Sequence, residues 1–313
     1  MPEITVLVPS YNHARFVEQT LRSIIAQTLK PARLIVIDDG SKDESVDVVR
    51  RVLSDCPFEN RLIARENRGL CSTLNEGLSL SGGEYLAYLG SDDLWLPNFL
   101  EEQVALLESR PKAVLAFSHA WVIDAEDNIV DRTDNWTEFA DGDMLPRLLL
   151  GEVFSSPGVV YRRPALDKVR WNEKAVLEDY ELYLNLSFEG EFARNEKLLC
   201  AWRQHGRNTS DDFPLMLREQ IAAQDRAFAK LGMTRGELDS TQKRMRFLAA
   251  ANCVRTGHKG KALSLFVQNI GAAPSFTDTL RMLPRLAAPQ SVFRWNRERK
   301  RRIAARKYGK LKI

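Results

Sequence analysis

Residues 85–93 read YLAYLGSDD, an apolar run that ends in a glycine, a serine and two adjacent aspartates. Short apolar runs of this kind are typical of strands buried inside a sheet. Polar residues that directly follow such a strand lie at its carboxyl end, which is where open α/β sheets bind their ligands. The segment therefore predicts a buried strand that delivers two carboxylates to a binding site.

The same pattern recurs along the N-terminal half of the chain. Three further apolar runs, at residues 4–8, 34–37 and 62–64, are each followed by a polar loop and a segment with helical spacing. Short strands that alternate with helices predict an α/β fold with a mostly parallel sheet and helices on both faces. Ser41 and Glu44 have the spacing of a capping box, so we expect the second helix to begin there.

The pattern changes in the second half. Residues 114–130 have the pattern of a β-hairpin, and from about residue 213 onward the apolar residues follow helical spacing. We therefore expect an α/β domain at residues 1–212 and a helical C-terminal region with a basic tail at residues 213–313. Pro284 and Pro289 are expected to interrupt the last helices, because proline lacks a backbone donor.

The composition is that of an ordinary folded protein, with 44% hydrophobic and 28% charged residues in a chain of 313. The four cysteines are scattered without a C-x-x-C pair, which favours reduced thiols in the cytoplasm over disulfides or a zinc site. No secretory signal is visible, and no apolar run approaches the roughly 20 residues that span a bilayer. We therefore expect a cytoplasmic protein that is soluble or at most peripheral on a membrane.

Positive charge is concentrated near the C-terminus. The net charge is +3, but from Arg294 onward ten Lys and Arg residues stand against Glu298 alone. Such a run is either a solvated helix or an anchor for an anionic membrane surface, with Phe293 and Trp295 as interfacial aromatic residues. We expect no binding to nucleic acid, because no recognition fold accompanies the basic run.

Several acids and one histidine stand at the ends of predicted elements. Asp39 follows the second strand, Asp92 and Asp93 follow the fourth, Asp179 begins a helical pattern, and His205 follows a late strand. Carboxylates hold divalent cations or act as bases, and a neutral imidazole can bind a metal. Each residue also has a structural explanation as a helix cap, a turn residue or a loop residue. No single one decides between the two.

The order of these segments along the chain resembles the family 2 glycosyltransferases of the GT-A fold. The resemblance covers about two thirds of the chain. The similar segments read VPSYN at 8–12, SIIAQT at 23–28, VIDDGSKD at 36–43, ENRGL at 66–70, LNEG at 74–77, GEYLAYLGSDD at 83–93, LEDYELYL at 177–184 and WRQHGRNTS at 202–210. The resemblance implies a Rossmann-like GT-A domain followed by a helical C-terminal extension.

The resemblance also implies which residues contact the nucleotide. Pro9 and Tyr11 would hold the base, and Asp39 would recognise it. Arg65 and Asn67 lie where the family has further nucleotide contacts. The chain departs from the family at residues 72–75, which read STLN where many members have Ala-Arg-Asn, so the contact of that arginine is in doubt.

Four more residues are implied in catalysis and metal binding. Asp92 resembles the ribose or phosphate partner and Asp93 the ligand of Mn²⁺ or Mg²⁺. His205 resembles a histidine that some members direct at the metal or the pyrophosphate. Asp179 resembles the general base, which takes the proton of the acceptor hydroxyl.

The implied function is an inverting, metal-dependent hexosyltransferase that uses a nucleotide-diphosphate sugar, with UDP as the expected nucleotide. The expected acceptor is a glycan or a lipid-linked oligosaccharide, in cell-surface polysaccharide or glycolipid synthesis at the cytoplasmic face of a membrane. The alternative is a catalytically silent scaffold that binds nucleotide sugars. A dehydrogenase or P-loop kinase is disfavoured, because neither G-x-G-x-x-G nor G-x-x-x-x-G-K-[ST] occurs where required.

Overall fold

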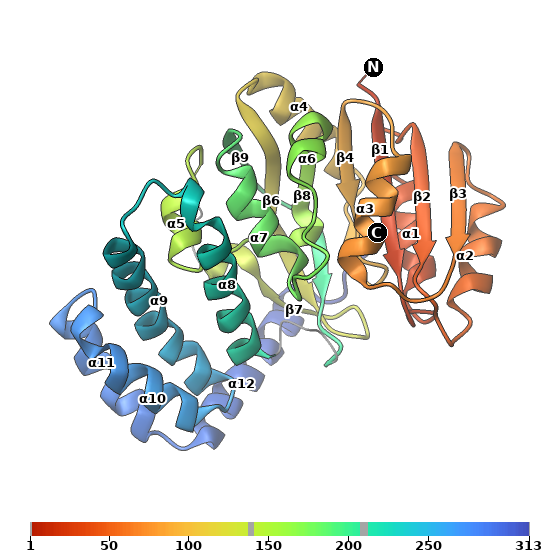
Figure 1. The fold of residues 1–313 in the computed structure, drawn as a ribbon. Coiled ribbons are helices and arrows are strands. Elements are labelled where there is room, and N and C mark those ends of the chain that lie inside the picture. Colours follow the sequence, from red (N-terminus) through yellow and green to blue (C-terminus); the bar gives the residue numbers. More distant parts are fainter. Residues whose placement is uncertain (1, 137–140, 207–211, 313) are drawn as a thin grey trace.

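A computed structural model describes residues 2–136, 141–206 and 212–312 of the protein. The described residues form one nine-stranded mixed sheet in the order β3-β2-β1-β4-β8-β6-β9-β5, with β7 paired to β6 outside this path. Helices cover both faces of the sheet (Figure 1). The strands are β1 (Ile4–Ser10), β2 (Arg33–Asp38), β3 (Glu59–Ala64), β4 (Tyr85–Tyr88), β5 (Leu94–Trp95), β6 (Ala113–Ile123), β7 (Ile129–Arg132), β8 (Val159–Arg162) and β9 (Glu191–Arg203).

The first four strands run parallel and end at one edge. Ser10 of β1 pairs with Asp38 of β2, and Asp38 pairs in turn with Ala64 of β3. Leu7 of β1 pairs with Tyr88, the last residue of β4. Because these strands are in register, the loops that follow them all lie at the carboxyl edge of the sheet.

The two faces of the sheet are buried under different helices. Leu7, Ile35 and Leu86 face a core formed with α3, α6 and α7, whereas Val6, Val36 and Ala87 face a core formed with α1, α2 and α4. This alternation is the two-residue period of a strand that is buried on both sides. The helices of this half are α1 (Val17–Ile25), α2 (Ser45–Leu53), α3 (Leu70–Leu80), α4 (Phe99–Ser109), α5 (Leu145–Leu149), α6 (Arg163–Val169) and α7 (Glu178–Leu186).

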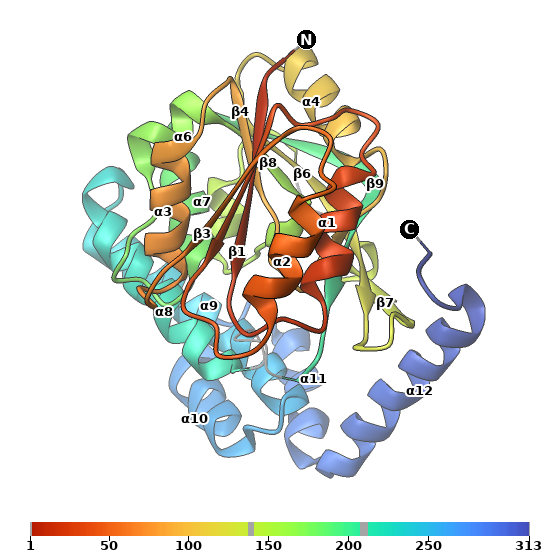
Figure 2. The same ribbon diagram turned by 90° about the vertical axis from the view of Figure 1, so that its right-hand side faces the viewer.

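Of the helices after residue 212, α10, α11 and α12 lie below the sheet in both views, whereas α8 lies beside α7 (Figures 1 and 2). They are α8 (Phe213–Ala227), α9 (Arg235–Arg255), α10 (Lys259–Asn269), α11 (Phe276–Ala287) and α12 (Gln290–Tyr308). α8 contributes Ala223 and Ala227 to the core around α7, and a separate apolar cluster joins α9, α10 and α11. The division at residue 212 stays a prediction.

The predicted α/β fold, with its mostly parallel sheet and helical C-terminal region, is confirmed. One local prediction is wrong, because α2 begins at Ser45 and has no capping box at Ser41. The Ser41 hydroxyl instead donates to Asp38 Oδ2 at 2.6 Å and accepts from the Asn12 N–H at 2.8 Å. Ser41 therefore joins two loops of the carboxyl edge, which its spacing from Glu44 did not reveal.

Gly83→Ala is expected to destabilise the fold. Gly83 has φ +81°, and an added Cβ would lie 2.4 Å from the Glu3 carbonyl oxygen. A side chain at such a φ costs roughly 1–3 kcal/mol before the contact is counted. Urea denaturation should therefore show a free energy of unfolding lower by at least that amount.

The matched control is Gly82→Ala, whose added Cβ would meet only Arg33 Nη1 at 3.8 Å. Equal losses of stability in the two variants would contradict this explanation.

Candidate functional site

Hydrogen bonds join the loops after β1 and β2 at the carboxyl edge of the sheet. Asn12, which has φ +56°, accepts from the Lys42 N–H at 2.7 Å through its side-chain oxygen. Ser10 Oγ donates to Asp38 Oδ2 at 3.1 Å, one residue before Asp39. These contacts fix the end of β1, which carries Pro9, and the following loop, which carries Tyr11. Tyr11 remains 48% exposed.

Asp39 and Arg65 form a nearly buried ion pair between the loops after β2 and β3. Asp39 also accepts from the N–H groups of Arg68 and Gly69, at 2.9 and 2.8 Å. Arg65 donates further to Glu76 Oε2, at 2.8 Å. The pair therefore shapes the loop that carries Asn67, and Asn67 itself is exposed.

Asp92 lies between two histidines. Its Oδ2 is 3.1 Å from His205 Nε2, and its Oδ1 is 3.8 Å from His13 Nδ1. Among the described residues, His13, Asp92 and His205 form a group whose ligand atoms all lie within 4.8 Å of one another. Burial lowers the pKa of His13, which favours the neutral ring that can bind a metal. The donor set of two imidazoles and one carboxylate therefore fits a divalent transition metal.

Asp93 points to a different partner. Its Oδ1 accepts from the Arg203 N–H at 2.8 Å, and burial raises the pKa of its carboxyl well above the ordinary value, with the charge of Asp92 as the second cause. The geometry thus gives Asp92, rather than Asp93, the position beside the histidines. The assignment of Asp93 as a metal ligand stays a prediction.

The Arg203 side chain holds the loops around Asp92 together. It is 1% exposed, and its Nε donates to the Asp92 carbonyl at 2.7 Å. Its Nη1 donates to Asp127 in the β6–β7 hairpin, and its guanidinium lies 4.8 Å from the centre of the Phe16 ring. Phe16 in turn stacks on His205, with ring centres 5.5 Å apart.

Glu178 and Asp179 form the first turn of α7 and come to the same edge. Tyr88, the last residue of β4, donates from its hydroxyl to Glu178 Oε1 at 3.2 Å. The charge of Glu178 is also one of the causes that raise the pKa of Asp93. Burial, followed by the charge of Glu178, raises the pKa of Asp179 to about 8. The start of α7 is thus electrostatically linked to the loop after β4.

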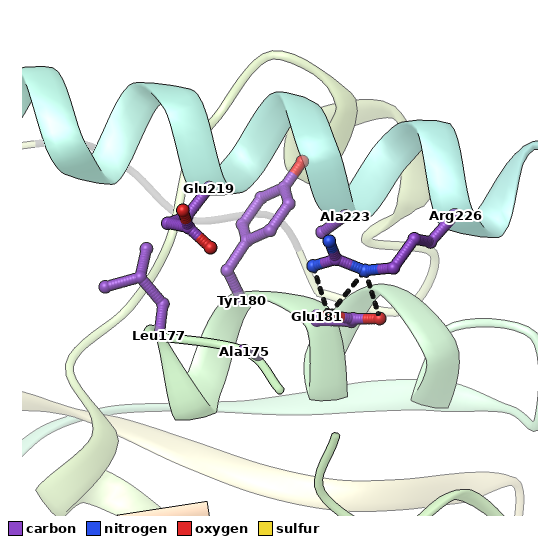
Figure 3. Close-up of a pocket in the computed structure, with 7 residues that line it drawn as sticks. All are labelled: Ala175, Leu177, Tyr180, Glu181, Glu219, Ala223 and Arg226. Carbon is purple, nitrogen blue, oxygen red and sulfur yellow. Dashed lines mark hydrogen bonds and ion pairs between the residues drawn. The ribbon is translucent and has the colours of Figure 1, made fainter. Parts of the chain in front are cut away.

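Side chains of α8 bind α7, the helix that carries Asp179, and hold it in place. Figure 3 shows a small pocket between α7 and α8 in which Arg226 faces Glu181. Arg226 Nη2 lies 2.6 Å from Glu181 Oε2, and Glu181 also accepts from Asn172. Gln224 of α8 donates to the Tyr180 hydroxyl at 2.8 Å. The C-terminal region therefore helps to position the first turn of α7.

The site contains three residues that were not predicted as site residues, namely His13, Glu178 and Arg203. His13 lies in the same loop as Tyr11, and Glu178 is adjacent to Asp179. Position after a strand or at the start of a helix was therefore an available signal. The role of Arg203 could not be read from its place in the sequence, because its partners are as distant as Gln19.

A mostly parallel α/β sheet with acids and histidines gathered at its carboxyl edge defines a GT-A-type fold. Residues 5–170 match the family described as Glycosyl transferase family 2, and the chain belongs to this family. The predicted resemblance is thereby confirmed, and the protein is a glycosyltransferase of that family.

Two relatives show how far the similarity extends. The chain is 28% identical over 216 residues to an uncharacterised glycosyltransferase of Nostoc sp. strain PCC 7120, a match that covers 66% of each protein. It is 27% identical over 221 residues to the chondroitin synthase of Escherichia coli, covering 67% of this chain and 30% of the synthase. The match therefore spans 66% of the length of the Nostoc protein and 30% of the length of the synthase.

Solved structures share the fold at low identity. A mannosyltransferase from Pyrobaculum calidifontis, in complex with GDP-Man and Mn²⁺, has a TM-score of 0.64 and 19% identity, covering 98% of this chain and 86% of that one. TarS of S. aureus, residues 1–349 with UDP-GlcNAc, has a TM-score of 0.62 and 16% identity, covering 99% and 93%. Among the described residues of our chain, none of the helices combines the length and apolar character needed to cross a bilayer.

Asp179→Asn is expected to stabilise the protein at high pH. The pKa of Asp179 is about 8 in the folded protein against an ordinary 3.8, so the native state keeps a proton that the unfolded state releases. Native stability from this group is present below pH 3.8 and is lost as the pH rises through about 8. The neutral amide avoids that loss. We expect the Tm of the variant to exceed that of the wild type by roughly 2 °C or more at pH 9.

At pH 4 the two proteins should melt at nearly the same temperature. Asp47→Asn, at a carboxylate that is 78% exposed, is the control and should change Tm little at either pH. An Asp179→Asn shift of equal size at both pH values would contradict the raised pKa.

Proposed function

We propose that the protein is an inverting, metal-dependent hexosyltransferase that moves a sugar from a UDP-sugar to an acceptor hydroxyl. The observation that supports this most directly is that two sets of acids meet at one edge of the sheet. Asp92, beside its histidines, follows β4, and the hydroxyl of Tyr88 at the end of β4 binds Glu178 next to Asp179. One set suits a cation-bound diphosphate and the other suits an incoming hydroxyl.

The nucleoside would bind over the loops after β1, β2 and β3. Tyr11 offers an exposed ring for the base, and Pro9 precedes it by two residues in the chain. The exposed Asn67 lies in the loop after β3. Asp39 has lone pairs left for a base after accepting from Arg65 and two backbone N–H groups. Arg65 would act mainly by holding Asp39. The UDP-GlcNAc complex of TarS, a protein of the same fold, supports UDP as the nucleotide.

Asp179 is the proposed general base. Its raised pKa gives the ionised carboxylate the proton affinity that base catalysis near neutral pH requires. The acceptor oxygen bonds to the anomeric carbon as the bond from that carbon to the diphosphate oxygen breaks, which inverts the configuration. The hydroxyl proton passes to Asp179, and the electron pair of the broken bond leaves with the nucleoside diphosphate.

Asp92, His205 and His13 are the proposed metal ligands, with Asp93 as the alternative carboxylate. Two imidazole nitrogens suit Mn²⁺ better than Mg²⁺, which prefers oxygen ligands. When bound, such a cation neutralises negative charge on the leaving diphosphate. The Mn²⁺ complex of the Pyrobaculum calidifontis mannosyltransferase supports this choice of metal.

A glycan or lipid-linked oligosaccharide is the proposed acceptor, in cell-surface polysaccharide or glycolipid synthesis at the cytoplasmic face of a membrane. The chondroitin synthase among the relatives supports a polysaccharide product. The competing function is a silent scaffold that binds nucleotide sugars without transfer. A scaffold needs the nucleotide loops but has no use for the carboxylate of Asp179.

Asp179→Asn should lower turnover by about a hundredfold or more, because that is the low end of a general-base contribution. The measurement is release of UDP from a panel of UDP-sugars in the presence of Mn²⁺, with donor binding followed by calorimetry. Binding should persist, since the substitution removes no proposed nucleotide contact. Asp47→Asn on α2 is the control, and unchanged turnover in Asp179→Asn would favour the scaffold.

Mn²⁺ binding should depend on the group around Asp92. We expect His205→Ala and Asp92→Asn each to weaken Mn²⁺ affinity in the presence of UDP by about tenfold or more, measured by electron paramagnetic resonance. His258→Ala, at an exposed histidine of the C-terminal region, is the control. A chelator should abolish UDP release, and added Mn²⁺ should restore it. Full activity in chelator would rule out the metal.

A further inference from the structure

Exposed apolar side chains are concentrated in three C-terminal helices. Of the fourteen large apolar side chains that are exposed among the described residues, eight lie on α10, α11 and α12, and a ninth, Ile270, directly follows α10. Phe276 is 76% exposed and Trp295 is 60% exposed. The nine are Leu263, Val267, Ile270, Phe276, Leu280, Leu283, Val292, Trp295 and Ile303. Scattered exposed apolar residues are normal on a protein surface, but a concentration of this kind marks an interaction site.

The spacing of these residues gives each helix an apolar stripe. They recur at 263 and 267 on α10, at 270 directly after it, and at 276, 280 and 283 on α11. Steps of four and three residues return to one side of an α-helix. The opposite flank of α11 carries Met282, which packs into the cluster formed with α9 and α10. The side chains of the stripes therefore remain exposed after the helices have packed against each other.

α12 presents basic and aromatic residues together on its outer face. Its inner face is defined by contacts, because Arg301 donates to Gln204 Oε1 at 2.7 Å and the Tyr308 ring packs on Trp121. Helical periodicity places 295, 299, 302 and 306 on the side away from these contacts. The guanidinium of Arg299 lies 5.6 Å from the centre of the exposed Trp295 ring.

The whole region is strongly basic. Residues 255–312 contain fifteen Lys and Arg residues and two acids, Asp278 and Glu298. Exposed apolar stripes within such a field fit a partner that offers negative charge at its surface and an apolar layer beneath. An anionic lipid bilayer has this composition.

The position of the region relative to the site supports the same partner. β1, β2 and β3 run downward in Figure 1, so the carboxyl edge of the sheet faces down, and α10, α11 and α12 lie at the bottom in both views (Figures 1 and 2). The contact of Arg301 with Gln204 joins α12 to the residue next to His205. A surface that docks through these helices would therefore lie on the same side of the protein as the carboxyl edge of the sheet.

We propose that α10, α11 and α12 form a docking surface for an anionic lipid bilayer. Phe276 and Trp295 enter the interfacial layer, and the outer arginines of α12, Arg299, Arg302 and Arg306, bind lipid phosphates. The inference rests on the proposed function in one respect, since it supplies the membrane on which a lipid-linked acceptor would be presented to the site.

Two other partners fit the same surface less well. A second copy of the chain would bring two strongly basic regions into contact, and like charges oppose such an interface. A nucleic acid would neutralise the arginines but would leave Phe276 and Leu280 in water. Both partners are outcomes that the experiment below distinguishes.

The test is flotation of the full chain with vesicles. Wild-type protein should float with vesicles of equal parts phosphatidylglycerol and phosphatidylcholine and should remain at the bottom with pure phosphatidylcholine. A variant carrying Arg299→Gln, Arg302→Gln and Arg306→Gln should lose on the order of a hundredfold in the partition coefficient. The matched control removes the same charge from α1 and α2 through Arg22→Gln, Arg50→Gln and Arg51→Gln and should float like wild type.

A second variant tests the apolar part. Phe276→Ser with Trp295→Ser should reduce partitioning by about tenfold or more, because two interfacial aromatic side chains are lost. Leu248→Ser, at a 39% exposed position on α9, is the control. These side chains are exposed, so the variants should keep the wild-type Tm.

Four results would overturn the proposal. They are absence of wild-type flotation, equal loss in the α1–α2 control, binding to single-stranded RNA at least as tight as to anionic vesicles, or dimers in light scattering that the same substitutions dissociate. UDP-sugar binding and UDP release are measured on the same proteins. Vesicle binding without UDP-sugar binding would reject the proposed function and retain the docking surface. Normal UDP release without vesicle binding would reject the docking surface and retain the proposed function.

Discussion

The buried guanidinium of Arg203 is the interaction on which the arrangement of the site depends. A charge in the interior must be paired and hydrogen-bonded, because removing one partner costs several kcal/mol. Arg203 meets that requirement by binding the Asp92 carbonyl, Asp127 of the β6–β7 hairpin and Gln19 of α1. Its backbone N–H binds Asp93 as well. One residue at the end of β9 therefore fixes the loop after β4, and through Phe16 it reaches His205.

The acids at the start of α7 illustrate a conflict between stability and chemistry. Burial raises the pKa of both Glu178 and Asp179, and repulsion by the charge of Glu178 raises the pKa of Asp179 further. The N-terminus of a helix favours negative charge, and this partly offsets the repulsion. The ion pair between Arg226 of α8 and Glu181 holds the first turns of α7 in place. In this way the helical C-terminal region supports the α/β domain.

The fold was largely predictable because its signals are local. Apolar runs such as residues 4–8 and 85–89 and the helical spacing between them define parallel strands and their order of appearance. The boundaries of helices were less accurate. Ser41 was expected to cap α2, but its hydroxyl is used by Asp38 and Asn12. Pro284 was likewise expected to interrupt a helix, but α11 contains it and ends three residues later, at Ala287.

The sequence by itself determined the class of fold, the family and the neighbourhood of the site, because residues after parallel strands necessarily meet at one edge. It also determined that positive charge accumulates after residue 254. Only the tertiary structure decided which of two adjacent aspartates lies beside the histidines, since successive residues at a loop point in different directions. The same holds for Arg203 and for the apolar stripes of α10 and α11, because burial depends on partners that are remote in the chain.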